Sequence, residues 1–292
     1  MSLIENARDV RTEFESHGWV REEGIFSRRE LDSWRDKIKK SQAEKLTGDL
    51  LSNPYLHPII YDERILATVT RILGGTPVYF GDSVANAGLE PGGLQFHKDC
   101  ADRLDENGPD WTLGNYSLVR VGIYLQDHTN YSGGLALRDG SHNIPNLSGG
   151  RPIAVESIPG DLICWSLRTT HSGFAARLRL FPRFFFPIRV LSKLVDTTYR
   201  LPLIFRPLPV ASPSDRMAVF ITYGRRDKHL ERYLLYLKTR KYAVDRWKRS
   251  QLDPAIVRSA TARGTLEVID LSAEAANIDL GPTDRGHMPL PY

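Results

Sequence analysis

The sequence is poor in cysteine and has no long apolar run. Cys100 and Cys164 are the only two cysteines among 292 residues, so the chain offers neither a disulfide framework nor a cysteine-based zinc site. No apolar stretch approaches the about 18 residues that a membrane-spanning helix needs. Residues 1–21 are mixed and charged and lack the apolar core of a secretory signal. A reducing, cytoplasmic location is therefore expected.

A strong excess of either charge is also missing. The 39 lysines and arginines stand against 35 acidic residues, which gives a net charge of only +4. No zinc-finger, RNP or basic-zipper pattern accompanies this charge, so nucleic-acid binding is not expected. The composition, 41% hydrophobic and 25% charged, is that of a globular protein with a sizeable core.

Helical patterns occupy the two ends of the chain. Ser27 followed by Glu30 forms a capping-box pattern that opens a helix reaching about Lys45. The other predicted helices cover residues 5–15, 62–73, 227–249 and 254–263, and the tail from residue 277 is irregular. The N-terminal helices are expected to pack against the back of a sheet.

The central part of the chain is rich in short β patterns separated by turn residues. The predicted strands are 77–80, 93–100, 117–126, 134–137, 153–157, 161–167 and 216–223, with a further short strand at residues 19–20. No helical pattern separates the central strands, which disfavours a parallel α/β sheet. The sequence predicts a mainly β fold with flanking helices, in the form of a sandwich, barrel or jelly roll.

One domain covering residues 1–292 is the simplest division. It comprises N-terminal helices (about 1–75), a β core (about 77–224) and a C-terminal helical extension (about 225–292). Residues 177–208 form an insert before the last strand and combine seven basic residues and many apolar residues with a single acid, Asp196. Three interpretations stay open for the insert: a lid, an oligomer contact, or a peripheral contact with a membrane surface.

The chemistry of the chain centres on His97-Lys98-Asp99. Residues i and i+2 of a strand point to the same face, so His97 and Asp99 can share one metal ion. His171, at the end of a later strand pattern, is the third ligand that we favour. Two histidines and one carboxylate leave coordination positions open, as in non-haem Fe(II) oxygenases.

At these residues the chain resembles the phytanoyl-CoA dioxygenase family. The resemblance rests on the H-x-D motif at residues 97–99, the Gly-Gly-Leu to Gly-Ser-His stretch at 133–142, and Gly160-Asp161-Leu162 leading to His171. The segment from Phe14 to Glu30 is similar to the opening of that family. The resemblance covers residues 14–224 and implies a double-stranded β-helix, a jelly roll.

The resemblance also implies cofactors and their ligands. Fe(II) would be held by His97, Asp99 and His171, and an arginine on the strand after the distal histidine would bind the remote carboxylate of 2-oxoglutarate. Arg216 begins the next convincing strand and is our favoured candidate, ahead of Arg179 and Arg177, which lie closer to the histidine.

The implied activity is that of a dioxygenase that uses 2-oxoglutarate and O2 and releases succinate and CO2. The presence of Asp99 favours hydroxylation over halogenation, while desaturation and cyclisation stay open. The expected substrate is a small or lipid-linked organic molecule. Two alternatives stay open: a cupin-like metal- or ligand-binding protein without turnover, and a metal enzyme that does not use 2-oxoglutarate.

The sequence also offers several other polar residues near the predicted site. Tyr124 and Gln126 share a strand face, and either could contact cosubstrate or substrate. Arg120 lies on the same face and could line the pocket. His128 is expected to be a solvated loop residue, and His142 a structural residue of its turn.

Overall fold

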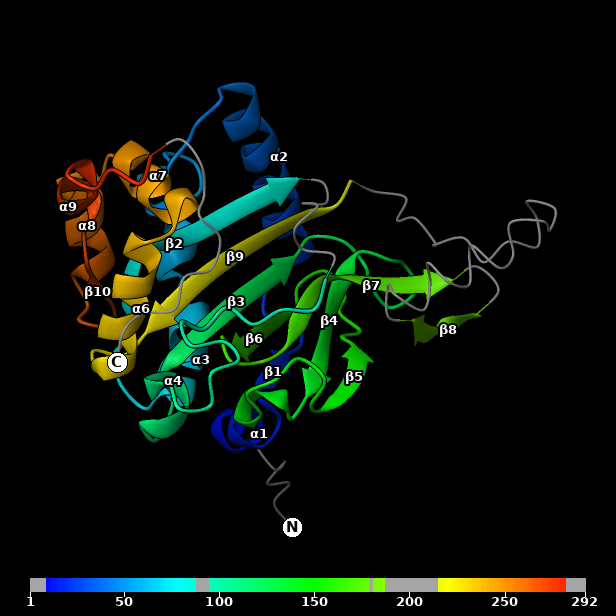
Figure 1. The fold of residues 1–292 in the computed structure, drawn as a ribbon. Helices are drawn as coiled ribbons and strands as arrows, with labels where there is room; N and C mark the ends of the chain where they lie inside the picture. Colours follow the sequence, from blue (N-terminus) through cyan, green and yellow to red (C-terminus); the bar gives the residue numbers. More distant parts are fainter. Residues whose placement is uncertain (1–8, 88–94, 179–180, 187–214, 282–292) are drawn as a thin grey trace, which may run out of the picture.

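The computed structural model describes residues 9–87, 95–178, 181–186 and 215–281. Within them, two mainly antiparallel sheets pack together and helices flank the larger sheet (Figure 1). The larger sheet has the order β1-β6-β3-β9-β2-β10, and the smaller has the order β5-β4-β7-β8. The strands are β1 (Trp19–Glu22), β2 (Val78–Ala87), β3 (Leu118–Tyr124), β4 (Gly134–Asp139), β5 (Arg151–Ala154), β6 (Leu162–Ser166), β7 (His171–Leu178), β8 (Phe181–Phe186), β9 (Met217–Gly224) and β10 (Glu267–Val268).

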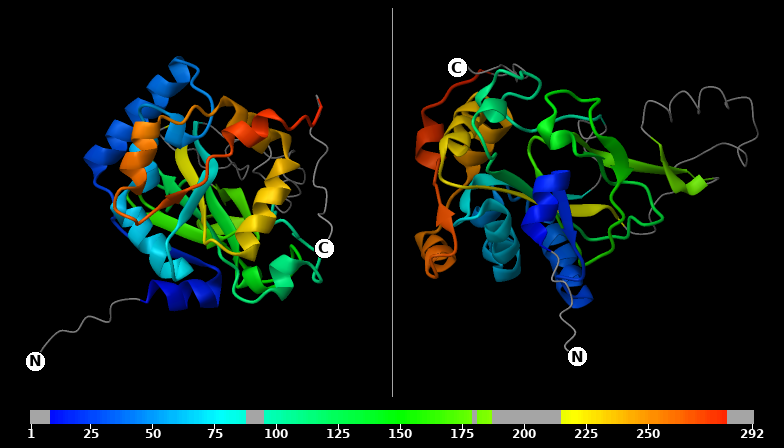
Figure 2. Two further views of the ribbon diagram at one scale, coloured as in Figure 1. Left: turned by 90° about the vertical axis from the view of Figure 1, so that its left-hand side faces the viewer. Right: turned by 90° about the horizontal axis from the view of Figure 1, so that it is seen from below.

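The helices lie at both ends of the chain, as predicted, with one additional short helix in the middle. Their bounds are α1 (Val10–His17), α2 (Arg28–Ala43), α3 (Glu63–Leu73), α4 (Pro109–Thr112), α6 (Lys228–Lys238), α7 (Lys241–Arg249), α8 (Pro254–Thr261) and α9 (Ser272–Ala276). The predicted capping box of Ser27 and Glu30 is present at the start of α2. Gly74, at φ 65°, ends α3 in the left-handed conformation that glycine adopts easily. Figure 2 shows these helices from two further directions.

Successive side chains of β3 point to opposite faces of the larger sheet. One face packs into the hydrophobic core with the helices, and the other borders the space between the two sheets. Val119, Val121 and Ile123 are fully buried in the cluster that includes apolar residues of α1, α2 and α3. Arg120 and Tyr124 lie between them in sequence and therefore point to the opposite face. β9 follows the same rule and pairs with β3 along its whole length. The larger sheet thus presents apolar residues to the helices. Its other face combines polar residues such as Arg120 with apolar residues such as Trp165, which belongs to a cluster with Leu135 of β4.

Two predicted elements take another form in the structure. Residues 93–100 were predicted as a strand, but the described residues from 95 onward form only a single bridge, between His97 and His171. The predicted helix 227–249 is two helices, because Arg240 is extended (φ −103°, ψ 115°) and redirects the chain between α6 and α7. The redirection buries Val244 and Trp247 against the residues of α6.

The start of the insert belongs to the smaller sheet. β7 and β8 pair antiparallel, so residues 177–178 and 181–186 contribute to that sheet rather than leaving it at once. The rest of the insert lies outside the described residues, and its role as a lid, an oligomer contact or a membrane contact stays a prediction. The single-domain division also stays a prediction. In the described ranges, every helix is too short or too polar to cross a membrane.

Candidate metal centre

Three predicted ligands meet at one point of the interior. His97 and Asp99 come from the segment before β3, and His171 is the first residue of β7. One ligand atom from each residue lies within 4.8 Å of the other two. The backbone holds them there, because the N–H groups of His97 and His171 each donate to the other's carbonyl at 2.9 Å. The close approach therefore depends on strand pairing, not on the predicted i, i+2 alternation alone.

The two imidazole rings are oriented by their second nitrogen atoms. Nδ1 of His97 lies 2.8 Å from the carbonyl oxygen of Gln95, and Nδ1 of His171 lies 3.0 Å from that of Thr169. A carbonyl oxygen can only accept, so each Nδ1 carries the proton and each Nε2 keeps its lone pair. The Nε2 atoms lie 3.6 Å and 3.4 Å from the Asp99 carboxylate oxygens. The donor set fits a divalent metal that accepts imidazole nitrogen and carboxylate oxygen.

The charges of the ligands suit metal binding. Burial acts to raise the pKa of the Asp99 carboxyl, but the positive charges that face it outweigh burial and hold this pKa well below its usual range. Arg120 and Arg103 are the permanent charges among these, and Nη2 of Arg120 lies 3.3 Å from Oδ2 of Asp99. Burial lowers the pKa of His171 to about 4. Near neutral pH, Asp99 is therefore ionised and His171 neutral, and these are the forms that bind a metal.

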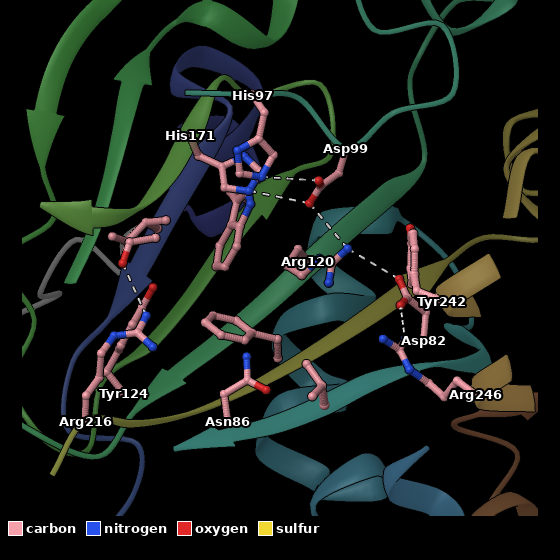
Figure 3. Close-up of a pocket in the computed structure, with 15 residues that line it drawn as sticks. Asp82, Asn86, His97, Asp99, Arg120, Tyr124, His171, Arg216, Tyr242 and Arg246 are labelled. Atoms are coloured by element: carbon pink, nitrogen blue, oxygen red, sulfur yellow. Dashed lines mark hydrogen bonds and ion pairs between the residues drawn. The ribbon is translucent and has the colours of Figure 1, made fainter. Parts of the chain in front are cut away.

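The three residues open onto a cavity of about 270 Å³. Figure 3 shows them beside Arg120, with Arg216 and Tyr124 on one side of the cavity and Tyr242 and Arg246 on the other. The remaining lining residues are Asp82, Val84, Asn86, Leu135, Trp165, Gly173 and Phe220. The cavity thus places a candidate metal centre between two groups of polar side chains.

Arg216 lies immediately before β9 and on the cavity wall. Its Nε donates to the carbonyl oxygen of Gly133 at 2.8 Å, and its Nη2 donates to that of Gly173 at 3.2 Å. The guanidinium carbon lies 5.8 Å from the centre of the Tyr124 ring. These contacts fix the guanidinium plane beside the cavity.

The two other candidate arginines are not equivalent to Arg216. Arg177 is buried and its Nη2 pairs with Glu156 at 3.1 Å, away from the cavity lining. Arg179 lies outside the described residues. Of these candidates, Arg216 is the one that the described structure brings to the same cavity as the histidines.

Several further predictions can be compared with the structure. Tyr124 and Arg120 both line the cavity, whereas the side chain of Gln126 binds the backbone of Met217 and the ring of His128. The expectation that His128 is solvated was wrong, because this side chain is only 2% exposed. Its loop folds inward, and the His128 backbone N–H donates to the carbonyl oxygen of Ser157 at 2.8 Å.

His142 lies apart from the three candidate ligands. Its side chain is buried and its Nε2 lies 3.0 Å from the carbonyl oxygen of Glu15. Its ring packs against Gly18, where an added Cβ would come within 2.4 Å of the imidazole. His142 therefore joins its turn to the end of α1, in agreement with the structural role predicted for it.

Several residues that line the cavity were not predicted from the sequence. β2 was predicted to end at Phe80, but it continues to Ala87 and carries Asp82 and Asn86 into the cavity. Tyr242 and Arg246 come from α7, where residues four apart share a face. Their spacing is visible in the sequence, but nothing in the sequence connects this helix with the histidines.

Comparison with known proteins supports the fold. No family model matches the chain, and no curated protein matches its sequence. HygX from Streptomyces hygroscopicus, solved with nickel and 2-oxoglutarate bound, has a TM-score of 0.52 and 16% identity over 75% of this chain and 87% of HygX. HygX with hygromycin B also bound has a TM-score of 0.51 and 17% identity over the same shares.

A second protein of known structure agrees with HygX. The non-haem monooxygenase ThoJ has a TM-score of 0.50 and 16% identity over 74% of this chain and 77% of ThoJ. At such low identity the likeness establishes the fold alone. It confirms the predicted jelly roll with flanking helices, while the resemblance to the phytanoyl-CoA dioxygenase family stays a prediction.

Proposed function

We propose that this chain is a non-haem iron oxygenase that uses 2-oxoglutarate and O2 as cosubstrates. His97, Asp99 and His171 would bind Fe(II), and Arg216 would bind the distal carboxylate of 2-oxoglutarate. The observation that carries the proposal is the convergence of these four residues on one cavity. The comparison with HygX supports the choice of cosubstrate, because that protein was solved with nickel and 2-oxoglutarate bound.

The chemistry follows from the donor set. When bound to two imidazoles and one carboxylate, Fe(II) keeps open positions for a 2-oxo acid and O2, and supplies oxidation of a substrate C–H bond coupled to release of succinate and CO2. Hydroxylation rather than halogenation is the proposed outcome, because Asp99 would take up the coordination position that a halide would need.

The protein's own residues orient the reactants. The carbonyl groups of Gln95 and Thr169 fix the imidazole rings, and Arg120 holds one oxygen of Asp99. The planar guanidinium of Arg216 suits a carboxylate, because its parallel N–H groups match the two oxygens. Trp165, Leu135 and Phe220 add apolar surface to the same cavity.

The first test is spectroscopic binding of 2-oxoglutarate. Purified protein with Fe(II) should develop a weak visible metal-to-ligand band when 2-oxoglutarate is added without oxygen, and should release succinate on exposure to O2. His171→Ala should abolish both signals. A protein that binds Fe(II) but never develops the band would favour the alternative of a metal-binding protein or an enzyme independent of 2-oxoglutarate.

Arg216→Ala tests the assignment of the cosubstrate anchor. Loss of a charge-assisted pair should weaken 2-oxoglutarate binding by about 1.5–3 kcal/mol, or roughly 10- to 150-fold, while Fe(II) binding is retained. Titration of the visible band measures this affinity. Arg258→Ala, at an exposed position of α8, is the control and should keep the wild-type affinity. An unchanged affinity in Arg216→Ala would reject this residue as the anchor.

A further inference from the structure

The cavity has a second polar side that the binding of iron and 2-oxoglutarate does not use. It is formed by Asp82 of β2 and by Tyr242 and Arg246 of α7. We propose that this side binds an oxyanion of the substrate, a carboxylate or a phosphate ester, with Arg246 as its main contact. This inference rests on the proposed function, because it names the substrate class of the same site.

Arg246 uses only part of its hydrogen-bonding capacity within the described part of the chain. Its Nη1 donates to Oδ1 of Asp82 at 2.6 Å, and its guanidinium carbon lies 5.8 Å from the centre of the Tyr242 ring. Among the described residues, no hydrogen bond is recorded for its Nε or Nη2. The side chain lines the cavity and is 17% exposed. A guanidinium held at one nitrogen by a carboxylate can offer its remaining N–H groups to a ligand.

Asp82 is not available for a cationic substrate. Its carboxylate also accepts from the Thr222 hydroxyl at 2.7 Å and pairs with Nη2 of Arg120 at 3.4 Å. The residue is only 3% exposed. Two guanidinium groups and a hydroxyl therefore use its lone pairs, and its role is to hold Arg246 and Arg120 in place (Figure 3).

The charge balance of the cavity favours an anionic substrate. The lining residues include three arginines (120, 216 and 246) and two aspartates (82 and 99), which leaves one positive charge. Fe(II) contributes two positive charges and 2-oxoglutarate two negative charges, so their binding leaves this excess unchanged. One negative group on the substrate would neutralise the site, whereas a cationic substrate would increase the imbalance.

A neighbouring neutral group adds a further donor. The side chain of Tyr242 lines the same side, and its hydroxyl keeps its proton at neutral pH and can donate to an anion. Val84 and Phe220 add apolar surface beside these donors. The site therefore fits an organic acid with an apolar body.

The two polar ends of the cavity are far enough apart for two ligands. Arg120, which pairs with Asp82, and Tyr124, which lies beside Arg216, are four residues apart on β3. At about 3.3 Å per residue they are separated by roughly 13 Å along the strand. The cosubstrate can thus occupy the Arg216 end while a substrate anion occupies the Arg246 end.

The test compares matched probes on the anaerobic complex with Fe(II) and saturating 2-oxoglutarate. Benzoate and benzamide have nearly the same shape and differ in charge, and phenyl phosphate replaces the carboxylate by a phosphate. Isothermal titration should show benzoate or phenyl phosphate binding at least about tenfold more tightly than benzamide. The stronger of the two anions identifies the preferred oxyanion. Equal binding of all three probes, or no preference for an anion, would overturn the proposal.

Arg246→Gln assigns the preference to the residue. The variant should lose the preference for anions, while Arg249→Gln, the same change at an exposed position of α7, should keep it. Arg246→Lys retains the charge and should keep part of the preference, which provides a second variant if the first folds poorly. An anion preference that persists in Arg246→Gln would also reject the proposal.

The affinity for 2-oxoglutarate distinguishes a failure of the proposed function from a failure of the anionic-substrate inference. It should be the same in Arg246→Gln and wild type, because the cosubstrate anchor is at the other end of the cavity. If wild type never develops the visible band, the proposed function fails, whatever the probes do. If the band develops but anions are not preferred, the function stands and the substrate inference fails.

Discussion

Tyr124 carries a buried hydroxyl that has no hydrogen-bond partner in the described part of the chain. Burial raises its pKa to about 12, so the hydroxyl is protonated at neutral pH and can donate. It lies on the cavity wall beside Arg216. An unpaired buried hydroxyl is costly in the free protein, and a ligand that accepts its hydrogen bond removes that cost. Tyr124 is therefore a candidate contact for 2-oxoglutarate.

Tyr124→Phe should separate function from stability. Removal of the unpaired hydroxyl should leave the free energy of unfolding unchanged or raise it by about 1 kcal/mol. The same change should weaken 2-oxoglutarate binding by about 2- to 10-fold, through the loss of one hydrogen bond. Chemical denaturation and titration of the visible band measure the two effects.

Tyr223→Phe is the matched control. The Tyr223 hydroxyl is also buried, but it donates to the carbonyl oxygen of Ile60 at 2.6 Å. Its removal leaves that carbonyl without this donor, so the variant should lose about 1–3 kcal/mol of stability and keep the wild-type affinity for 2-oxoglutarate. The same response in both variants would contradict a ligand-binding role for Tyr124.

At the scale of elements, an irregularity in β2 connects the C-terminal helices to the cavity. Between Tyr79 and Ser83 the strand advances four residues while its partner β9 advances two, from 223 to 221. Gly81 lies in this bulge at φ 73°, and Trp247 of α7 packs against it. The indole Nε1 of Trp247 donates to the carbonyl oxygen of Phe80 at 3.0 Å. The bulge thus allows α7 to pack closely against β2, which brings the Arg246 guanidinium within hydrogen-bonding distance of Asp82.

Gly81→Ala should destabilise the protein more than Gly140→Ala. Both glycines have a positive φ, so each substitution should cost about 1–2 kcal/mol of backbone strain. At Gly81 an added Cβ would come within 2.9 Å of the Trp247 ring, whereas Gly140 has open space. Displacement of the ring should add about 1–3 kcal/mol, as measured by chemical denaturation. Equal losses of stability in the two variants would show that α7 can move away from the added Cβ without a cost in free energy.

At the scale of the whole molecule, stability should depend on pH through histidines that are buried without charge. Burial lowers the pKa of His128 to about 4, and the nearby Arg216 acts in the same direction. Its Nε2 lies 2.7 Å from the amide nitrogen of Gln126, which requires the ring to accept there. The folded protein therefore holds this imidazole neutral well below the pKa of about 6.5 that it has when unfolded.

The direction in which stability changes with pH follows from proton binding at His128. Between pH 6.5 and pH 4 the unfolded chain binds a proton at His128 and the folded chain does not, so stability falls as the pH falls. From pH 7 to pH 5 the metal-free protein should lose about 2 kcal/mol through this residue. His128→Asn should make the dependence of unfolding free energy on pH shallower by that amount, with an unchanged denaturant m-value. An identical dependence in the variant would contradict the buried, neutral state of His128.

The sequence by itself determined the fold class and the candidate ligands. Alternating apolar residues in β3 and β9 specify strands with one face in a core, and the capping box of Ser27 marks the start of α2, because these are local properties of the chain. His97, Asp99 and His171 were predicted from motif and spacing together with the resemblance to a known family. Arg216 was predicted from that resemblance and from the strand pattern that follows it.

Only the tertiary structure decided how these residues meet and what surrounds them. His97 approaches His171 through a bridge between segments more than 70 residues apart, and α7 reaches Asp82 through the bulge at Gly81. The burial of His128 depends likewise on the path of its loop. Such contacts depend on the packing of distant segments, for which the local sequence carries no signal. The Arg246 side of the cavity is therefore visible only in the folded chain.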